Sequence, residues 1–273
     1  MRARSAIVAA GAVGLAVGAG LIWGRWLRRR QLTWQRLLAD NIPVHSAYWR
    51  ARRELPGDLV YIAIGDSAAQ GIGASRPARS YVGVLAKRLE KRTGLAVRVV
   101  NLSISGATLG TAIEKELPRF LHIRSELVDA AVITVSVGAN DIAAWDAERF
   151  ERELDLLLSQ LPPHAIVADL PSFYFLPGER KALAGNRILR STAAKYGLRV
   201  VDLHDTMRRE GVRGVTTQFA GDLFHPNDRG YVVWANAFEQ AVRDRVVQLQ
   251  DSVGSALTSA LSQSRASTNT SSA

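Results

Sequence analysis

The sequence contains no cysteine among its 273 residues. This absence excludes a disulfide scaffold, a thiolate nucleophile and a zinc site with cysteine ligands, but it leaves the redox compartment open. Acidic residues are scarce at the N-terminus: residues 1–53 hold ten arginines and one acid, Asp40, and so carry +9 of the net charge of +10. The remainder is nearly neutral. Charge clustered in this way argues against a nucleic-acid-binding surface.

Charged and polar side chains are also missing from residues 6–23, where every residue is apolar or glycine. As an α-helix this run would extend roughly 27 Å, close to the hydrocarbon thickness of a bilayer. Arginines flank it on both sides, and Trp23 and Trp26 stand where interfacial aromatic residues occur. We therefore predict a single-pass membrane anchor with basic flanks over residues 1–30. A cleaved signal peptide is the alternative.

The orientation of this predicted anchor rests on two opposing considerations. More positive charge follows the apolar run than precedes it, which by the positive-inside rule favours a cytoplasmic domain. An N-terminal anchor usually precedes an exported domain, and we predict a cell-membrane protein whose folded domain is extracytoplasmic. Gly14 and Gly18 form a G-x-x-x-G pair, which permits a helix-mediated homodimer. No strand precedes these glycines, so they do not predict a dinucleotide site.

Composition divides the rest of the chain into three segments. Residues 31–56 are a basic juxtamembrane linker in which Trp34, Leu37 and Leu38 have helical spacing. This linker is predicted either to lie on the membrane surface or to form a solvated connecting helix. Residues 57–250 form one folded domain, and residues 251–273, rich in Ser, Thr and Ala, are predicted to be a disordered tail.

Short apolar runs alternate with longer amphipathic stretches throughout the folded domain. The predicted strands cover residues 59–64, 97–102, 130–135, 165–168 and 199–203. The predicted helices cover residues 80–92, 110–120, 146–160, 179–196 and 228–247. Strands that are apolar on both faces and alternate with helices indicate a parallel sheet covered on both sides. We predict a flavodoxin-like α/β sandwich of three layers with a five-stranded parallel sheet.

Polar residues follow the predicted strands at the edge where such sheets bind ligands. Gly65-Asp66-Ser67 comes directly after the first strand, and Gly106 follows the second. Asn140 follows the third strand, and Asp222 and His225 come after the fifth. All of these segments are therefore predicted to converge on one rim of the sheet.

These blocks resemble the GDSL-type, or SGNH, hydrolase family, which is named after the Ser, Gly, Asn and His of successive sequence blocks. The resemblance covers about residues 58–248. It implies that Ser67 is the nucleophile, that Asp222 and His225 complete a catalytic triad, and that Ser67, Gly106 and Asn140 supply the oxyanion hole. It also implies ester hydrolysis without a metal or organic cofactor. Ala68 stands where the family name has Leu, which bears on the subfamily more than on activity.

The chemistry of acyl transfer asks for the same residue types. A serine hydroxyl is a weak nucleophile until a base within hydrogen-bond reach takes its proton, and His225 can act as that base near neutral pH. Asp222, three residues earlier, can hold the other ring nitrogen. Taken alone, Gly65-Asp66-Ser67 also fits an ordinary capped turn, Gly106 a tight turn and Asn140 a helix cap. The combination of blocks favours the catalytic interpretation.

Two further features are open to more than one interpretation. His204-Asp205 follows a strand and could form a second dyad or a metal site, but we predict a capped helix start because no metal-spaced cluster accompanies it. The aromatic residues Phe173, Tyr174 and Phe175, with Leu176 after them and Trp145 earlier in the chain, either line an acyl pocket or pack beneath the loop.

The sequence thus predicts a membrane-anchored serine hydrolase that cleaves carboxylic esters, such as lipid or acylated-glycan esters, through an acyl-serine intermediate. Two alternatives remain. An acyltransferase would pass the acyl group to a lipid or glycan hydroxyl instead of water. A non-catalytic, membrane-tethered binding module would use the same fold without its chemistry.

Overall fold

The computed structural model describes residues 2–123 and 125–270, and the side chains of residues 23–123 and 125–252. Its centre is one five-stranded parallel sheet in the order β2-β1-β3-β4-β5. The strands are β1 (Leu59–Gly65), β2 (Val97–Asn101), β3 (Ala131–Ser136), β4 (Ile166–Ala168) and β5 (Arg199–Val201). The predicted flavodoxin-like sheet is therefore confirmed. Its strand order reverses between β1 and β3, where ligand sites of such folds lie.

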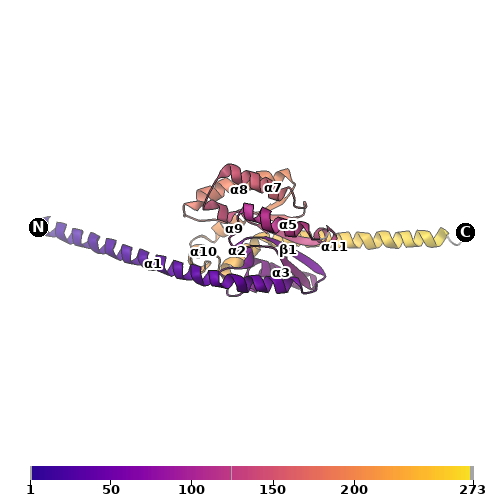
Figure 1. Cartoon of the computed structure of the whole chain (residues 1–273), viewed down its shortest axis with the longest axis horizontal. Coiled ribbons are helices and arrows are strands. Elements are labelled where there is room, and N and C mark those ends of the chain that lie inside the picture. Colours follow the sequence, from indigo (N-terminus) through magenta and orange to yellow (C-terminus); the bar gives the residue numbers. More distant parts are fainter. Residues whose placement is uncertain (1, 124, 271–273) are drawn as a thin grey trace.

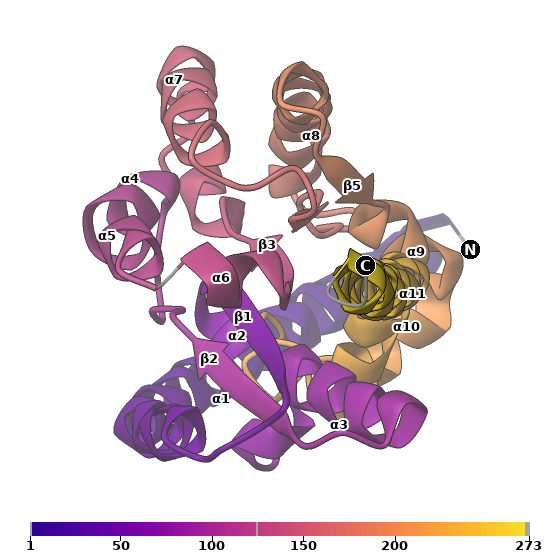
Figure 2. The ribbon, with the colours of Figure 1, turned by 90° about the vertical axis from the view of Figure 1, so that its right-hand side faces the viewer.

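Helices cover both faces of the sheet, as Figure 2 shows. One face carries α2 (Ser67–Gln70), α3 (Tyr81–Thr93), α9 (Leu203–Arg209), α10 (Gly211–Thr217) and α11 (Asp228–Thr270). The other carries α4 (Leu109–Thr111), α5 (Leu117–Leu121), α6 (Ser125–Asp129), α7 (Ala147–Leu158) and α8 (Gly178–Lys195). Short 3-10 turns span Pro77–Arg79 and Ala139–Ile142, and a π-helical turn spans Ala112–Glu116.

The alternation of β1 explains why two separate cores form. Tyr61 and Ala63 point into the core beneath α3 and α11, while Ile62 and Ile64 point into the core beneath α5, α7 and α8. All of these side chains are completely buried. Burial on both faces is the reason why the strands are apolar throughout and do not alternate between polar and apolar residues.

Local capping fixes the ends of the main helices at the predicted places. The Ser80 side chain accepts a hydrogen bond from the Gly83 amide at the start of α3, and Gly94 ends that helix in the left-handed conformation at φ 71°. Asp146 caps α7 by accepting from the Arg149 amide. Such caps satisfy amides that have no partner within the helix.

Helix α1 (Arg2–Arg53) places part of the predicted linker inside the folded body. Trp49 is 3% exposed and belongs to the core beneath α3, and Leu38 packs with Ile72 and Ala220. The N-terminal half of α1 projects away from the body, beyond the end where α2 and α10 lie (Figure 1). Residues 38–53 of the predicted linker are therefore part of a helix whose apolar stripe packs against the folded domain, a contact that neither the membrane-surface nor the solvated-helix expectation included.

The two ends of the chain carry predictions that the structure tests only in part. Within residues 23–123 and 125–252, no helix is long and apolar enough to cross a membrane. Residues 6–22 of the predicted anchor, including Gly14 and Gly18, lie outside the side chains that the structure describes. The backbone of α11 continues as helix to Thr270, into the predicted disordered tail, where no proline interrupts it.

Candidate active site

Ser67 stands at the first position of α2, immediately beyond the end of β1. Asp66 caps this helix, because its Oδ1 accepts a hydrogen bond from the Ala68 amide at 2.8 Å. Gly65 is required at the strand end, since a Cβ there would come within 2.7 Å of the Ser136 carbonyl oxygen on neighbouring β3. The chain thus turns sharply from strand to helix and holds Ser67 at the rim of the sheet.

A chain of hydrogen bonds connects Ser67, His225 and Asp222. The Ser67 Oγ lies 3.0 Å from His225 Nε2, and His225 Nδ1 lies 2.6 Å from Asp222 Oδ2. The other oxygen of Asp222 accepts from the amides of Phe224 and His225, at 3.2 and 3.1 Å. The turn between Asp222 and His225 holds Leu223 at φ 58°, an unusual conformation for a residue other than glycine. The predicted Ser, His and Asp therefore meet in a geometry fit for proton transfer.

The electrostatics of Asp222 favour its charged form. Burial acts to raise the pKa of this carboxyl, but the hydrogen bond and charge of His225, with the two backbone amides, outweigh it and leave the pKa below its ordinary value. The side chain is buried, and His225 covers it from the solvent side. A carboxylate fixed in this way can orient an imidazole and stabilise its protonated form.

Asn140 and Gly106 also lie at this rim of the sheet. Asn140 belongs to the 3-10 turn after β3, and its Nδ2 donates to the Ala107 carbonyl at 2.9 Å and faces Asp66 Oδ2 at 3.4 Å. Asn140 lines the same cavity as Ser67 and His225. Gly106 adopts φ 79° in the turn between β2 and α4. The bond between Asn140 and Ala107 ties the two predicted oxyanion segments together.

Two buried carboxyl groups, those of Asp66 and Glu116, lie at the turn of residues 65–67, which carries the predicted nucleophile and is called the nucleophile turn here. Burial raises the pKa of Asp66 to about 6, and the Ala68 amide opposes this rise. Glu116, on the π-helical turn, accepts a hydrogen bond from the Gly65 amide at 2.9 Å. Burial raises the pKa of Glu116 to about 8, opposed by that same bond. Sequence analysis missed Glu116, because it stands among ordinary charged residues of a predicted amphipathic helix.

A cavity of about 250 Å³ opens beside Ser67 and is lined almost entirely by apolar side chains. One wall is the loop of residues 171–177, called the pocket loop here, which connects β4 to α8. The other apolar lining residues are Ala68, Ala139, Met207, Val215, Phe219, Leu223, Phe224, Pro226 and Trp234. Phe173, Tyr174, Phe175 and Leu176, which were predicted either to line an acyl pocket or to pack beneath the loop, all line this cavity.

Trp145 and Phe173 also show the alternative packing that was considered for the aromatic residues. Trp145 packs on Phe150 at a centroid distance of 5.1 Å in the core beneath α7 and α8, and Phe173 packs partly against the same core. Trp145 is not among the cavity-lining residues that the structure describes. The wall interpretation is therefore wrong for Trp145.

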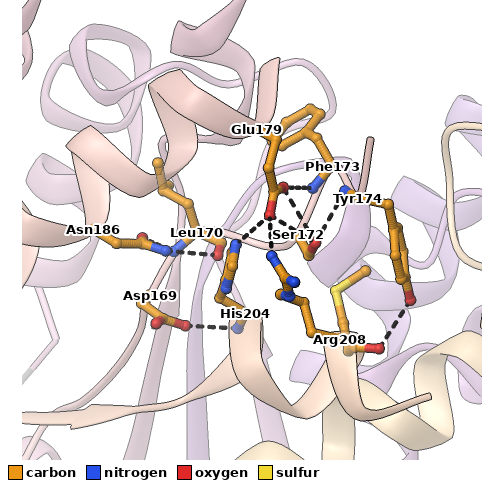
Figure 3. Close-up of polar contacts among 10 residues, drawn as sticks. Asp169, Leu170, Ser172, Phe173, Tyr174, Glu179, Asn186, His204 and Arg208 are labelled. Carbon is orange, nitrogen blue, oxygen red and sulfur yellow. Dashed lines mark hydrogen bonds and ion pairs between the residues drawn. The ribbon is translucent and has the colours of Figure 1, made fainter. Parts of the chain in front are cut away.

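His204 does not pair with Asp205 but with Glu179 (Figure 3). Its Nε2 lies 2.9 Å from Glu179 Oε1, while Asp205 pairs with Arg209. A helix does start here, since α9 begins at Leu203, but the predicted cap is wrong because the N-cap residue Asp202 makes no side-chain capping hydrogen bond. Ser172 also bonds Glu179, but the carboxylate lies between the serine and the histidine, so these residues do not form a second triad. The described residues contain no cluster of three or more His, Asp or Glu that could hold a metal ion.

Comparison with known proteins agrees with this architecture. Residues 63–233 match the GDSL-like Lipase/Acylhydrolase family. The GDSL-like esterase Rv1075c of Mycobacterium tuberculosis is 30% identical over 216 residues, which cover 74% of this chain and 67% of that protein. The extent of these two matches is sufficient to assign the chain to a family. The chain belongs to the GDSL-like lipase/acylhydrolase family.

Solved structures share the fold at lower sequence identity. The crystal structure of TesA superposes with a TM-score of 0.55 at 23% identity, and the match covers 68% of this chain and 99% of that one. Axe2, an acetylxylan esterase from Geobacillus stearothermophilus, superposes with a TM-score of 0.52 at 19% identity and covers 68% and 94% of the two chains. The resemblance predicted from the sequence blocks is thus confirmed at the level of both family and fold.

Proposed function

We propose that this protein hydrolyses carboxylic esters through an acyl-serine intermediate, with Ser67 as nucleophile. The single observation that carries the proposal is the hydrogen-bonded chain from Asp222 through His225 to Ser67 at the edge of an apolar cavity. Membership of the GDSL-like lipase/acylhydrolase family supports the same reaction class.

In the proposed first step, Ser67 Oγ attacks the ester carbonyl carbon while His225 Nε2 takes the hydroxyl proton. Asp222 accepts a hydrogen bond from His225 Nδ1–H throughout and, as a carboxylate, stabilises the charged ring. Collapse of the tetrahedral intermediate breaks the bond to the alcohol, which leaves with the proton from His225. Water then attacks the acyl-serine with the same base and releases the acid.

The proposed oxyanion hole consists of the Ser67 and Gly106 amides and the Asn140 side chain. The Ala107 carbonyl accepts one Nδ2 hydrogen of Asn140 at 2.9 Å and so orients the amide, and the second hydrogen, which faces Asp66 Oδ2 at the longer distance of 3.4 Å, is the one proposed to bind the oxyanion. A donor fixed before the reaction needs no reorganisation when the negative charge develops, and one such donor contributes about 2.7–4 kcal/mol.

The apolar lining favours an apolar acyl group over a polar one, and we propose that this group is of short to medium length. Phe175, Leu176 and Phe224 line the cavity and remain exposed at its mouth. Such a rim suits esters that are themselves amphiphilic, including lipid and acylated-glycan esters. Axe2 is an acetylxylan esterase and the mycobacterial relative is an esterase, and both activities are compatible with this range.

We further propose that residues 1–30 anchor the enzyme to the cell membrane, with the hydrolase domain on the extracytoplasmic side. Two observations support this proposal: residues 6–23 are an unbroken apolar run, and α1 packs against the folded domain. The Trp34 indole lies over Gly221, beside Asp222, where a Cβ would come within 2.1 Å of the ring. Trp34 is 8 residues, about 12 Å of helix, beyond Trp26. An anchor of this kind would hold the cavity close to the membrane surface.

The test is hydrolysis of p-nitrophenyl esters, from acetyl to palmitoyl, by the full chain beside its Ser67→Ala variant. The proposal expects turnover that the variant loses. If the folded wild type turns over no ester faster than the variant, hydrolysis is the wrong reaction, and acyl transfer to an added alcohol should be assayed next. Absence of both activities would favour a binding module.

A further inference from the structure

We propose that Glu179 is a positioning residue that sets acyl chain-length selectivity by holding the pocket loop in place. The inference rests on the proposed esterase function and adds to it a specific determinant of the substrate. Glu179 stands in the first turn of α8 and is 8% exposed. It lies outside the hydrogen-bonded chain of Ser67, His225 and Asp222, and its role is separate from theirs.

The Glu179 carboxylate binds the pocket loop at both Ser172 and Phe173 (Figure 3). Its Oε2 accepts a hydrogen bond from the Phe173 amide at 2.6 Å, and the Ser172 hydroxyl donates to the same carboxylate at 3.2 Å. Ser172 Oγ in turn accepts from the Tyr174 amide at 2.9 Å. One carboxylate therefore fixes, directly or through Ser172, three consecutive residues of a loop that has no strand or helix of its own.

The conformation imposed on Tyr174 shows that the loop needs this support. Tyr174 has φ 55°, in the left-handed region that side chains other than those of Gly, Asn and Asp rarely adopt. Such a conformation is unfavourable and persists only where its surroundings determine it. Here the Tyr174 amide is bound by Ser172, and its hydroxyl donates to the Met207 carbonyl at 3.0 Å.

Helix α9 fixes the carboxylate from the opposite side. His204 Nε2 lies 2.9 Å from Glu179 Oε1, and the Arg208 guanidinium donates to the same oxygen at 3.4 Å. The His204 backbone amide donates to Asp169 Oδ1, at the end of β4. Glu179 thus links the pocket loop to α9 and to the strand from which the loop departs.

The link ends at side chains that line the cavity and not at Ser67, His225 or Asp222. Tyr174 packs edge-on against Phe219, and both residues line the cavity with Met207. An acetyl group occupies only the space beside Ser67, whereas an octanoyl group must extend along this wall. Displacement of the pocket loop should therefore weaken the use of long acyl groups and leave that of short ones nearly unchanged.

The test compares kcat/KM for p-nitrophenyl octanoate and acetate in the wild type and in Glu179→Gln. An amide keeps the size of the side chain but has one acceptor oxygen, so at least one of the donors from Phe173, Ser172, His204 and Arg208 loses its partner. Loss of a hydrogen bond to a charged group corresponds to a change of about tenfold or more in an equilibrium or rate constant. We expect the octanoate-to-acetate ratio to fall about tenfold, mainly through KM for octanoate, with acetate within about twofold of wild type.

Two further variants separate positioning from general damage. His204→Gln keeps a donor toward Glu179 and should keep the wild-type ratio, whereas His204→Leu removes the donor and should lower the ratio. Glu148→Gln, on an exposed side chain in the first turn of α7, is the matched control and should change neither ester. If Glu179→Gln fails to fold, the His204 pair decides the question.

The outcomes distinguish this inference from the proposed function. Wild-type turnover of either ester that depends on Ser67 supports the esterase. An unchanged ratio in folded Glu179→Gln, or an equal loss on both esters, would overturn the positioning role and leave the esterase standing. Thermal unfolding of each variant, measured in parallel, identifies those that fold.

Discussion

Glu116 offers a prediction whose size follows from the structure. Its carboxyl is completely buried, and its pKa is raised from 4.5 to about 8. Between these values the folded protein keeps the proton that the unfolded chain has released. The stabilisation is therefore fully present below pH 4.5 and is lost as the pH rises toward 8. Glu116→Gln removes this titration but keeps an oxygen that can accept the Gly65 amide.

The expected magnitude comes from the same two values. Each pH unit between them removes at most about 1.4 kcal/mol from the free energy of unfolding. The wild type should thus lose about 3 kcal/mol from this group between pH 5 and pH 8. Glu116→Gln should not show that loss. Asp66, whose pKa is also raised, to about 6, adds a similar but smaller decline that both proteins share.

Urea unfolding of the wild type and Glu116→Gln at pH 5 and pH 8 measures this difference. Any pH-independent cost of the amide cancels, because only the change between the two pH values is compared. From pH 5 to pH 8, we expect the free energy of unfolding of the variant to rise by about 3 kcal/mol relative to that of the wild type. Parallel losses in the two proteins would refute the assignment of a raised pKa to Glu116.

Three further predictions concern the candidate active site and the packing of α1 against the folded domain. Asn140→Ala should lower kcat about 10²–10³-fold with little change in KM, since its amide is proposed to act on the oxyanion, and steady-state kinetics with p-nitrophenyl acetate would show this. Asp222→Asn should lower kcat about 10⁴-fold while the fold is kept, as checked by kinetics beside circular dichroism; wild-type turnover would remove Asp222 from the mechanism. Trp49→Ala should destabilise the protein by about 3–5 kcal/mol in urea, because Trp49 is buried and donates to the Gln70 carbonyl, whereas Trp26→Ala, at an exposed site, should change little. Equal effects of the two tryptophans would contradict the packing of α1.

The sheet and the catalytic candidates could be predicted because their signals are local in the sequence. Each buried strand is a short apolar run, and the polar residues that meet at the rim stand directly at strand ends, as Ser67 and Asn140 do. Parallel topology then brings these ends together without knowledge of any individual contact. For this reason His225 and Ser67 could be paired although 158 residues separate them.

The missed features depend on contacts that leave no pattern in the sequence. The stripe of Leu38 and Trp49 on α1 is the same whether it packs on a membrane or on a domain, and only the complementary surface at Gln70 and Ile72 decides between them. Glu116 and Glu179 bind backbone amides, which every sequence provides. Their importance comes from burial and from the place of those amides in the nucleophile turn and the pocket loop.

The central claim is that His225 activates Ser67 as the nucleophile, and the most direct measurement is covalent labelling of Ser67. The full chain is treated with an alkyl fluorophosphonate and analysed by intact mass and peptide mapping. We expect one adduct, located on Ser67, which forms rapidly in the wild type and far more slowly in His225→Ala. A protein that hydrolyses esters while Ser67 stays unlabelled, or that is labelled at another residue, would contradict it.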